Sequence, residues 1–229
     1  MLQHSLFDLL AVLSGIAVYV WLPMPSGVGA RQPLGLDPLY PMALAGGALL
    51  GAYLIGTLNA WLSGAPGLGR SIEGGIAGAV LAVELLKRRR GIVGSTGVRF
   101  AAPMAAAIGT GRIGCFLAGL EDFTYGTPTA LPWAHDFGDG VMRHPVQLYE
   151  STAMLLFLAI FIVLLRLRHP LAVRAGFYLF VGVYSGQRFL WEFLKPYGTV
   201  VGPFNLFHLL SMMLIAYAIV YARRELQRA

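Results

Sequence analysis

The sequence has few charged residues and a single cysteine. Charged side chains make up 12% of the 229 residues, whereas 57% are hydrophobic, and the mean hydropathy is +0.67. A composition so poor in charge excludes an ordinary water-soluble domain. The lone Cys115 excludes an internal disulfide framework and a cysteine-ligated zinc or iron–sulfur centre.

Long apolar segments fill most of the chain and leave no room for a separate soluble domain. A helix needs about 20 apolar residues to cross a bilayer. Seven segments approach this length, at residues 5–22, 38–62, 72–86, 100–117, 146–165, 173–193 and 204–222. They lack the alternating pattern of barrel strands. We therefore predict an all-α polytopic membrane protein, with residues 1–229 forming one transmembrane domain of seven transmembrane helices. No Lys or Arg precedes the first segment, so we expect it to be retained rather than cleaved as a signal peptide.

The positions of the basic residues predict the orientation. If the seven segments alternate and the C-terminus is cytoplasmic, 12 of the 17 Lys and Arg residues fall on the inner side, mainly at 87–90, 166–174 and 223–228. The positive-inside rule thus favours an N-out, C-in topology. We interpret these clusters as anchors that contact anionic headgroups. The net charge of +6 therefore reports topology rather than nucleic-acid binding. The one long loop, 118–145, then lies outside, and long loops often carry function.

Five ionisable residues lie in or at the edge of the predicted spans, all in the outer half of the membrane. An ionisable side chain at this depth indicates a functional site by default. Four different segments supply them: Glu73, Arg112, Glu150, Arg188 and Glu192. Tyr184 precedes Arg188 by four residues, as Arg188 precedes Glu192, so these three share one helix face. We expect this face to point into the bundle.

The two arginines predict a phosphate site. A guanidinium is always charged and can bind phosphate through two parallel hydrogen bonds, and nearby carboxylates can orient it or accept a proton. In the outer leaflet the available phosphate is a phospholipid headgroup. The glycines at 74, 75 and 78 are most simply explained by close helix packing, and Cys115 by packing rather than nucleophilic chemistry. His144 is either a base or a structural hydrogen-bonding residue, and with His135 it forms no convincing metal site.

Several segments together resemble the signature of the prolipoprotein diacylglyceryl transferase family. They read SIEGGIAG at 71–78, GRIGCFLAG at 111–119, YG at 125–126, RHPVQLYE at 143–150 and YSGQRFLWEF at 184–193. The resemblance covers roughly half of the chain and is fairly specific. Its implied topology agrees with the one expected from charge.

The resemblance implies a reaction and a set of site residues. In the family, the diacylglyceryl group of phosphatidylglycerol moves to the lipobox cysteine of a prolipoprotein at the outer face of the bacterial inner membrane, releasing glycerol 1-phosphate. Arg112 and Arg188 match the arginines thought to hold the lipid phosphate, and Glu150 and Glu192 match acidic positions. Further matched positions are expected to bind substrate: Tyr184, Arg143, His144, Tyr149, Gly74 and Gly75. The implied partners are phosphatidylglycerol, a prolipoprotein signal peptide and membrane lipids, without a metal or organic cofactor.

Four departures from the family pattern keep alternatives open. Glu73 stands where the family has a histidine, so Glu73 becomes the expected base, and Cys115 stands where it has an asparagine. The segment 120–125 is shifted and the loop 194–203 is short. One alternative is a paralogue that uses phosphatidylglycerol with another acceptor. A second is a protein that binds or translocates phospholipid without chemistry, and a structural subunit ranks last.

Overall fold

Seven long helices form the part of the chain that the structure describes. The structure is a computed structural model that describes residues 2–24, 38–65 and 67–228, with side chains from Leu6 onward. The long helices are α1 (Leu2–Trp21), α2 (Leu39–Leu62), α3 (Ile72–Arg90), α4 (Val98–Ala118), α5 (Val146–Arg166), α7 (Gly176–Glu192) and α8 (Leu206–Gln227). Each of the seven predicted segments therefore overlaps one long helix.

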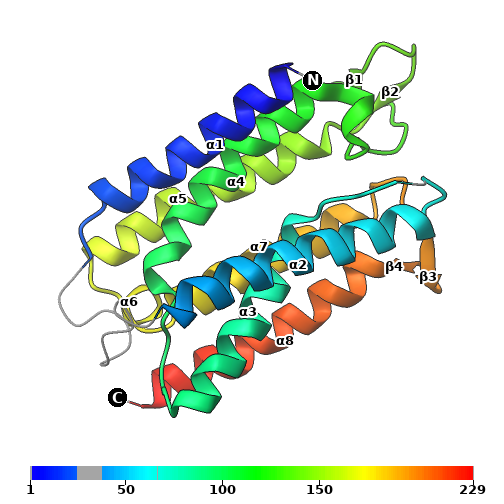
Figure 1. Cartoon of the computed structure of the whole chain (residues 1–229). Coiled ribbons are helices and arrows are strands. Elements are labelled where there is room, and N and C mark those ends of the chain that lie inside the picture. Colours follow the sequence, from blue (N-terminus) through cyan, green and yellow to red (C-terminus); the bar gives the residue numbers. More distant parts are fainter. Residues whose placement is uncertain (1, 25–37, 66, 229) are drawn as a thin grey trace.

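Helix α7 lies between two groups of helices (Figure 1). It contacts α4 and α5 on one side and α8 on the other, while α1 packs on α4, and α2 packs on α3. Aromatic rings join α5 to α7. The Phe157 ring of α5 lies 5.9 Å from the Phe180 ring of α7, and it stacks on Phe161 of its own helix at 5.4 Å, between ring centroids. Phe180 in turn stacks on Tyr184 at 6.0 Å. This buried stack fixes the position of α7.

Four described helices are long and apolar enough to cross a membrane, namely α2, α4, α5 and α8. Helix α1 adds a shorter apolar segment at Leu6–Trp21. Many of their large apolar side chains face outward, including Leu49 at 63% exposure and Val20 at 67%. Such an exposed apolar surface is unfavourable in water and suits contact with lipid. The chain is therefore a helical membrane protein.

Glycines bring α2 and α3 into close contact. A Cβ atom built on Gly74 would lie 2.5 Å from the carbonyl oxygen of Gly51, and one on Gly75 would lie 3.4 Å from that of Ala48. Any larger side chain at position 74 would force the two helices apart. The packing explanation of this glycine run is thus confirmed.

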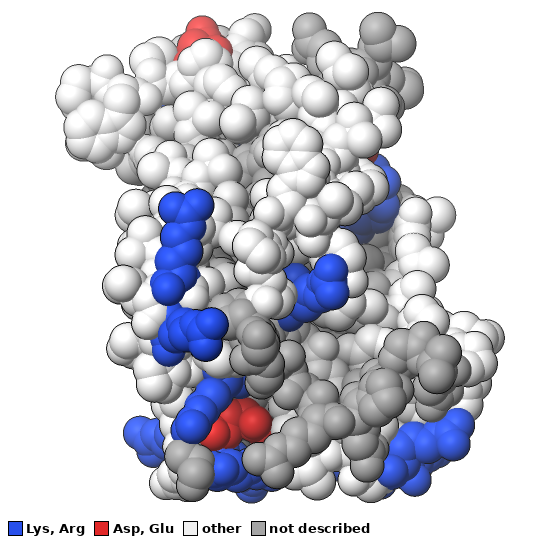
Figure 2. Space-filling view, turned by 90° about the vertical axis from the view of Figure 1, so that its left-hand side faces the viewer, with Lys and Arg blue, Asp and Glu red and all other residues white. Residues whose placement is uncertain are grey.

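The basic clusters lie together at one end of the bundle. Figure 2 shows the face at the left-hand side of Figure 1, where blue side chains are frequent and red ones are rare. Arg88 donates to the Tyr221 hydroxyl at 3.4 Å, which joins the ends of α3 and α8. Lys87 differs from the expected exposed anchor, since it is 4% exposed and pairs with Glu84 at 2.8 Å. The exposed arginines that the structure describes at this end are Arg88, Arg89, Arg90, Arg99, Arg166, Arg168, Arg174, Arg223, Arg224 and Arg228.

Two short hairpins lie at the opposite end, toward the right in Figure 1. Strand β1 (His135–Asp136) pairs antiparallel with β2 (Met142–Arg143), and β3 (Thr199–Val201) pairs with β4 (Phe204–Asn205). The 310 helix η2 (Gly119–Asp122) precedes the first hairpin. The predicted loop 118–145 therefore has its own local structure.

The structure moves several predicted boundaries, including the end of α8, which lies at Gln227 rather than residue 222. Helix α3 continues to Arg90 rather than ending at residue 86, because basic side chains in a last turn interact favourably with the helix dipole. Gly91 then ends the helix at a φ of 64°, which glycine adopts without strain. The sixth predicted segment, 173–193, corresponds to α7, which begins at Gly176 instead of residue 173, and the short helix α6 (Pro170–Val173) precedes it.

Candidate active site

Six charged side chains are buried together at the hairpin end. We call them the ion cluster: Glu73 of α3, Arg112 of α4, Glu150 of α5, Arg188 and Glu192 of α7, and Lys195. Each residue is at most 5% exposed. The five residues predicted from the sequence are therefore brought together. The sixth, Lys195, was not among the residues predicted for the site.

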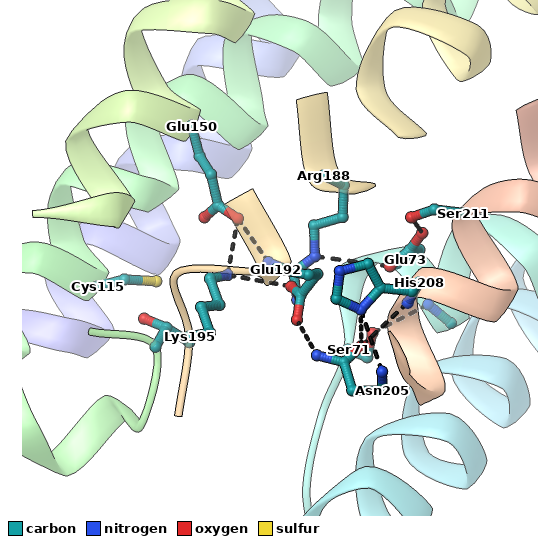
Figure 3. A network of polar contacts seen from close by, with 12 residues as sticks. Ser71, Glu73, Cys115, Glu150, Arg188, Glu192, Lys195, Asn205, His208 and Ser211 are labelled. Carbon is teal, nitrogen blue, oxygen red and sulfur yellow. Dashed lines mark hydrogen bonds and ion pairs between the residues drawn. The ribbon is translucent and has the colours of Figure 1, made fainter. Parts of the chain in front are cut away.

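Arg188 lies at the centre of the ion cluster (Figure 3). Its terminal nitrogens lie 2.5 Å from Glu150 and 2.7 Å from Glu192, and its Nε lies 3.5 Å from Glu73. All three guanidinium nitrogens thus face carboxylate oxygens from three helices. Arg188 stabilises the convergence of α3, α5 and α7, since removing it would leave buried carboxylates uncompensated.

Arg112 is bound on one side only. Its Nε lies 2.8 Å from Glu150 Oε2, and one terminal nitrogen lies 3.9 Å from Cys115 Sγ. Sulfur is a weak acceptor. None of the described residues gives an oxygen acceptor to the two terminal nitrogens of Arg112. Arg112 therefore keeps the pair of donors that binds phosphate bidentately.

Lys195 completes the charge balance. Its Nζ lies 2.8 Å from Glu150 and 3.5 Å from Glu192, and its side chain is fully buried. Three cations then face three carboxylates, which is how ionised groups tolerate burial in an apolar environment. Lys195 follows Glu192 by three positions, which agrees with their contact but does not distinguish it from a solvated lysine.

Helix α8 contributes polar side chains that the sequence analysis missed. Ser211 donates to Glu73 Oε1 at 2.5 Å, and the Asn205 amide nitrogen donates to Glu192 Oε2 at 3.0 Å. Asn205 also caps α8, since its side-chain oxygen accepts from the His208 backbone N–H at 3.0 Å. An Asn directly before an apolar run is a recognised start signal for a helix, so its cap could have been found from the sequence, but its contact with Glu192 could not.

Several buried polar groups near the ion cluster lack a protein partner. Tyr184, 1% exposed, lies one turn before Arg188, and its hydroxyl has no hydrogen-bond partner among the described residues. The side-chain amides of Gln147 and Gln187 likewise have no hydrogen-bond partner among the described residues. Buried polar groups are normally satisfied. Unpaired groups beside three buried cations are consistent with a site that receives a polar ligand.

The remaining predicted substrate-binding residues have contacts of their own, with residues outside the ion cluster. Arg143 pairs with Asp139 at 2.6 Å in the loop 118–145, and this contact lowers the pKa of the Asp139 carboxyl. His144 Nδ1 lies 3.4 Å from the Tyr149 hydroxyl, and the Tyr149 ring lies 5.3 Å from that of Trp191. Gly74 and Gly75 face α2, as described above. A substrate contact for these five residues stays a prediction.

The fold and the ion cluster together define a class of protein. Guanidinium and ammonium groups buried in a helical membrane protein, with donors still free on Arg112, suit recognition of an anionic lipid headgroup. The family model described as prolipoprotein diacylglyceryl transferase matches residues 39–223. The chain belongs to this family of transferases.

Individual relatives agree with the family. A Geobacter sulfurreducens protein named phosphatidylglycerol–prolipoprotein diacylglyceryl transferase is 31% identical, over 98% of this chain and 93% of the relative. Proteins of the same name from Nitratidesulfovibrio vulgaris and Cupriavidus pinatubonensis are 39% and 34% identical. Those alignments cover 56% and 70% of this chain, and 48% and 61% of the relatives. No solved structure matches the chain significantly.

Proposed function

We propose that this chain transfers the diacylglyceryl group of phosphatidylglycerol to the lipobox cysteine of prolipoproteins, at the outer face of the bacterial inner membrane. The observation that carries the proposal is the convergence of Arg112 and Arg188, from two helices, on one buried carboxylate, Glu150. This arrangement offers fixed positive charge to a phospholipid phosphate. Membership of the transferase family supplies the reaction.

The proposed topology has seven spans, with the N-terminus outside and the C-terminus inside. It is supported by the separation of the exposed arginines at one end of the bundle from the ion cluster at the other. By the positive-inside rule, the basic end is cytoplasmic. Residues 1–229 then form one transmembrane domain, and the loop 118–145 lies above the site on the outer side. A phospholipid with two acyl chains reaches such a site laterally, from the outer leaflet.

The phosphate binds first to Arg112 in this mechanism. Its two terminal nitrogens have no oxygen acceptor among the described residues and can take two phosphate oxygens. The added negative charge weakens the Arg112–Glu150 pair. Lys195 already contacts Glu150 at 2.8 Å and keeps that carboxylate compensated. Tyr184, with its unpaired hydroxyl, is placed to donate to the bound lipid.

The transfer is a substitution at the glyceryl carbon that carries the phosphate ester. The acceptor thiolate forms the C–S bond as the C–O bond to phosphate breaks, and the electron pair stays on the departing glycerol phosphate. Arg112 and Arg188 stabilise that charge. Glu73, the base predicted from the sequence, contacts both Arg188 and Ser211. This geometry also suits a role in orienting Arg188, and the base role of Glu73 stays a prediction. Glu150 and Glu192 orient the same cations, and Arg143, His144, Tyr149, Gly74 and Gly75 are proposed to border the approach of the substrates.

The test is mass spectrometry of the purified protein incubated with phosphatidylglycerol and a lipobox peptide. We expect a diacylglyceryl thioether on the peptide together with glycerol phosphate, and neither product with Arg112→Ala or with a peptide that carries serine in place of cysteine. Glycerol phosphate without thioether would indicate a different acceptor. Bound lipid without either product would instead support a binding or translocating protein.

A further inference from the structure

Gln147 is a buried polar side chain that the mechanism above does not use. It lies in the first turn of α5 and is 0% exposed, and neither its amide oxygen nor its amide nitrogen has a hydrogen-bond partner among the described residues. A side-chain amide has two N–H donors and a carbonyl acceptor. Leaving these groups unpaired in a buried position costs free energy. Such a group in a native protein calls for an explanation, and a polar ligand that pairs with it is one.

Gln147 lies on the face of α5 that forms the site. Residues three and four apart share a helix face, so Gln147 shares this face with Glu150 and Ser151. Glu150 contacts both arginines of the ion cluster, and Ser151 donates to the carbonyl oxygen of Gly109 in α4 at 2.7 Å. All three residues of this face are buried. The amide of Gln147 is therefore enclosed on the same side of α5 as the ion cluster.

The register of α4 against α5 brings Gln147 to the level of Arg112. The hydrogen bond between Ser151 and Gly109 fixes where the two helices meet. Helix α4 ends at the hairpin end of the bundle, and α5 begins there (Figure 1). One turn from this hydrogen bond toward the hairpin end, α4 carries Arg112 and α5 carries Gln147. The unpaired amide thus lies at the level of the guanidinium that is proposed to bind phosphate.

The depth of Gln147 suits contact with a lipid headgroup. A phospholipid of the outer leaflet directs its headgroup toward the hairpin end and its acyl chains toward the middle of the bundle. Gln147 lies one turn nearer the hairpin end than Glu150, whereas Tyr184 lies one turn further from that end than Arg188. With the phosphate on Arg112, the headgroup then extends toward Gln147, and the acyl esters extend toward Tyr184.

Resting on the proposed function, we infer that Gln147 recognises the glycerol headgroup of phosphatidylglycerol and thereby selects this lipid. A hydroxyl group both donates and accepts, and the amide offers both counterparts. An ammonium headgroup has donors only, and it would lie beside the three cations of the ion cluster. A site that hydrogen-bonds a hydroxyl rejects a ligand without one, because the polar group of the protein is then left unpaired. Gln147 acts in lipid binding and takes no part in bond formation.

The test compares phosphatidylglycerol with phosphatidylethanol, which has the same phosphodiester charge and no headgroup hydroxyl. Dissociation constants are measured in detergent without acceptor peptide, so that no thioether forms. We expect the unmodified protein to bind phosphatidylglycerol about 10-fold or more tightly than phosphatidylethanol, as for hydrogen bonds to a buried group. Gln147→Leu should weaken the binding of phosphatidylglycerol about 10-fold or more and should not weaken that of phosphatidylethanol.

Thermal stability separates recognition from packing. Leucine is of similar size and has no polar atoms to leave unpaired, so Gln147→Leu should unfold in lipid-free detergent at the same temperature as the unmodified protein or at a higher one. A packing role for the amide would lower this temperature. Gln227→Leu is the control, because Gln227 lies at an exposed position of the basic end. It should bind both lipids as the unmodified protein does.

Three results would overturn the assignment. They are equal affinity of the unmodified protein for the two lipids, equal weakening of both lipids by Gln147→Leu, and unchanged selectivity in that variant. The thioether assay tests the proposed function separately. Selective binding of phosphatidylglycerol without thioether formation would reject the transfer reaction and keep the headgroup role of Gln147. Thioether formation without selectivity between the two lipids would reject the headgroup role alone.

Discussion

The two arginines of the ion cluster differ in how many donors they keep, and this difference predicts different consequences for Arg112→Lys and Arg188→Lys. Arg112 contacts a carboxylate through Nε alone. A lysine at position 112 can still neutralise Glu150, but it cannot present two parallel N–H groups to phosphate. The loss of one charge-assisted hydrogen bond costs about 1.5–3 kcal/mol. We therefore expect kcat/KM for phosphatidylglycerol to fall about 10- to 150-fold, with little change in thermal stability.

Arg188→Lys should act on stability instead. Arg188 faces carboxylates at 2.5, 2.7 and 3.5 Å from three helices, through three nitrogens in a fixed plane. One ammonium group cannot reproduce this geometry, so at least one buried carboxylate loses its partner. Breaking a buried pair in this way costs about 3–5 kcal/mol. The expected result is a clearly lower unfolding temperature, accompanied by loss of activity.

The assay measures both quantities on the same preparations. Initial rates of thioether formation are recorded against phosphatidylglycerol in mixed micelles, and unfolding is followed by intrinsic fluorescence in the same detergent. A wild-type kcat/KM for Arg112→Lys would refute the binding of phosphate by the two terminal nitrogens of Arg112. Equal destabilisation by the two substitutions would refute the distinction between Arg112, which binds phosphate, and Arg188, which stabilises the convergence of the helices.

Three more outcomes follow from the contacts. Lys195→Met should destabilise the protein by about 3–5 kcal/mol, because two carboxylates lose a partner, and adding Glu150→Gln should recover part of that loss in denaturant unfolding. Gly51→Leu should lower the unfolding temperature by separating α2 from α3, whereas Gly46→Ala should not, since a Cβ there meets nothing within 4 Å. Asp139 has a lowered pKa, so its ion pair stabilises the β1–β2 hairpin above the ordinary carboxyl pKa of about 4 and is lost as the pH falls below it. Hydrogen-exchange protection of that hairpin should therefore be lower below about pH 4 than above it. Equal protection above and below this pH would contradict the prediction.

The helices, and the gathering of charged residues at one end of the bundle, could be predicted because the bilayer constrains both directly. Apolar runs must be helical to satisfy their backbone in lipid, and charged residues are costly enough there to stand out in the sequence. Glu73, Arg112, Glu150, Arg188 and Glu192 were found for this reason. Their convergence was inferred from depth alone, and the ion pairs agree with it.

Residues that depend on tertiary packing could not be predicted in this way. Lys195 follows the last turn of α7, where a lysine is ordinarily solvated, and only the fold turns it back onto Glu150. Asn205 is an ordinary residue for the start of a helix. Its part in the site depends on the position of α8 beside α7, for which the sequence has no periodic signal.

The equal number of cations and carboxylates explains how one site can be stable without substrate and still bind an anion. Buried guanidiniums without partners would be costly in a membrane protein, so each must be compensated before the lipid arrives. Glu150 provides this for Arg112, yet it also contacts Lys195, and can therefore release Arg112 without becoming unpaired. The phosphate then takes the place of a carboxylate at Arg112, and Glu150 still contacts Arg188 and Lys195. Lys195, which the sequence analysis did not select, is thus the residue that allows the exchange.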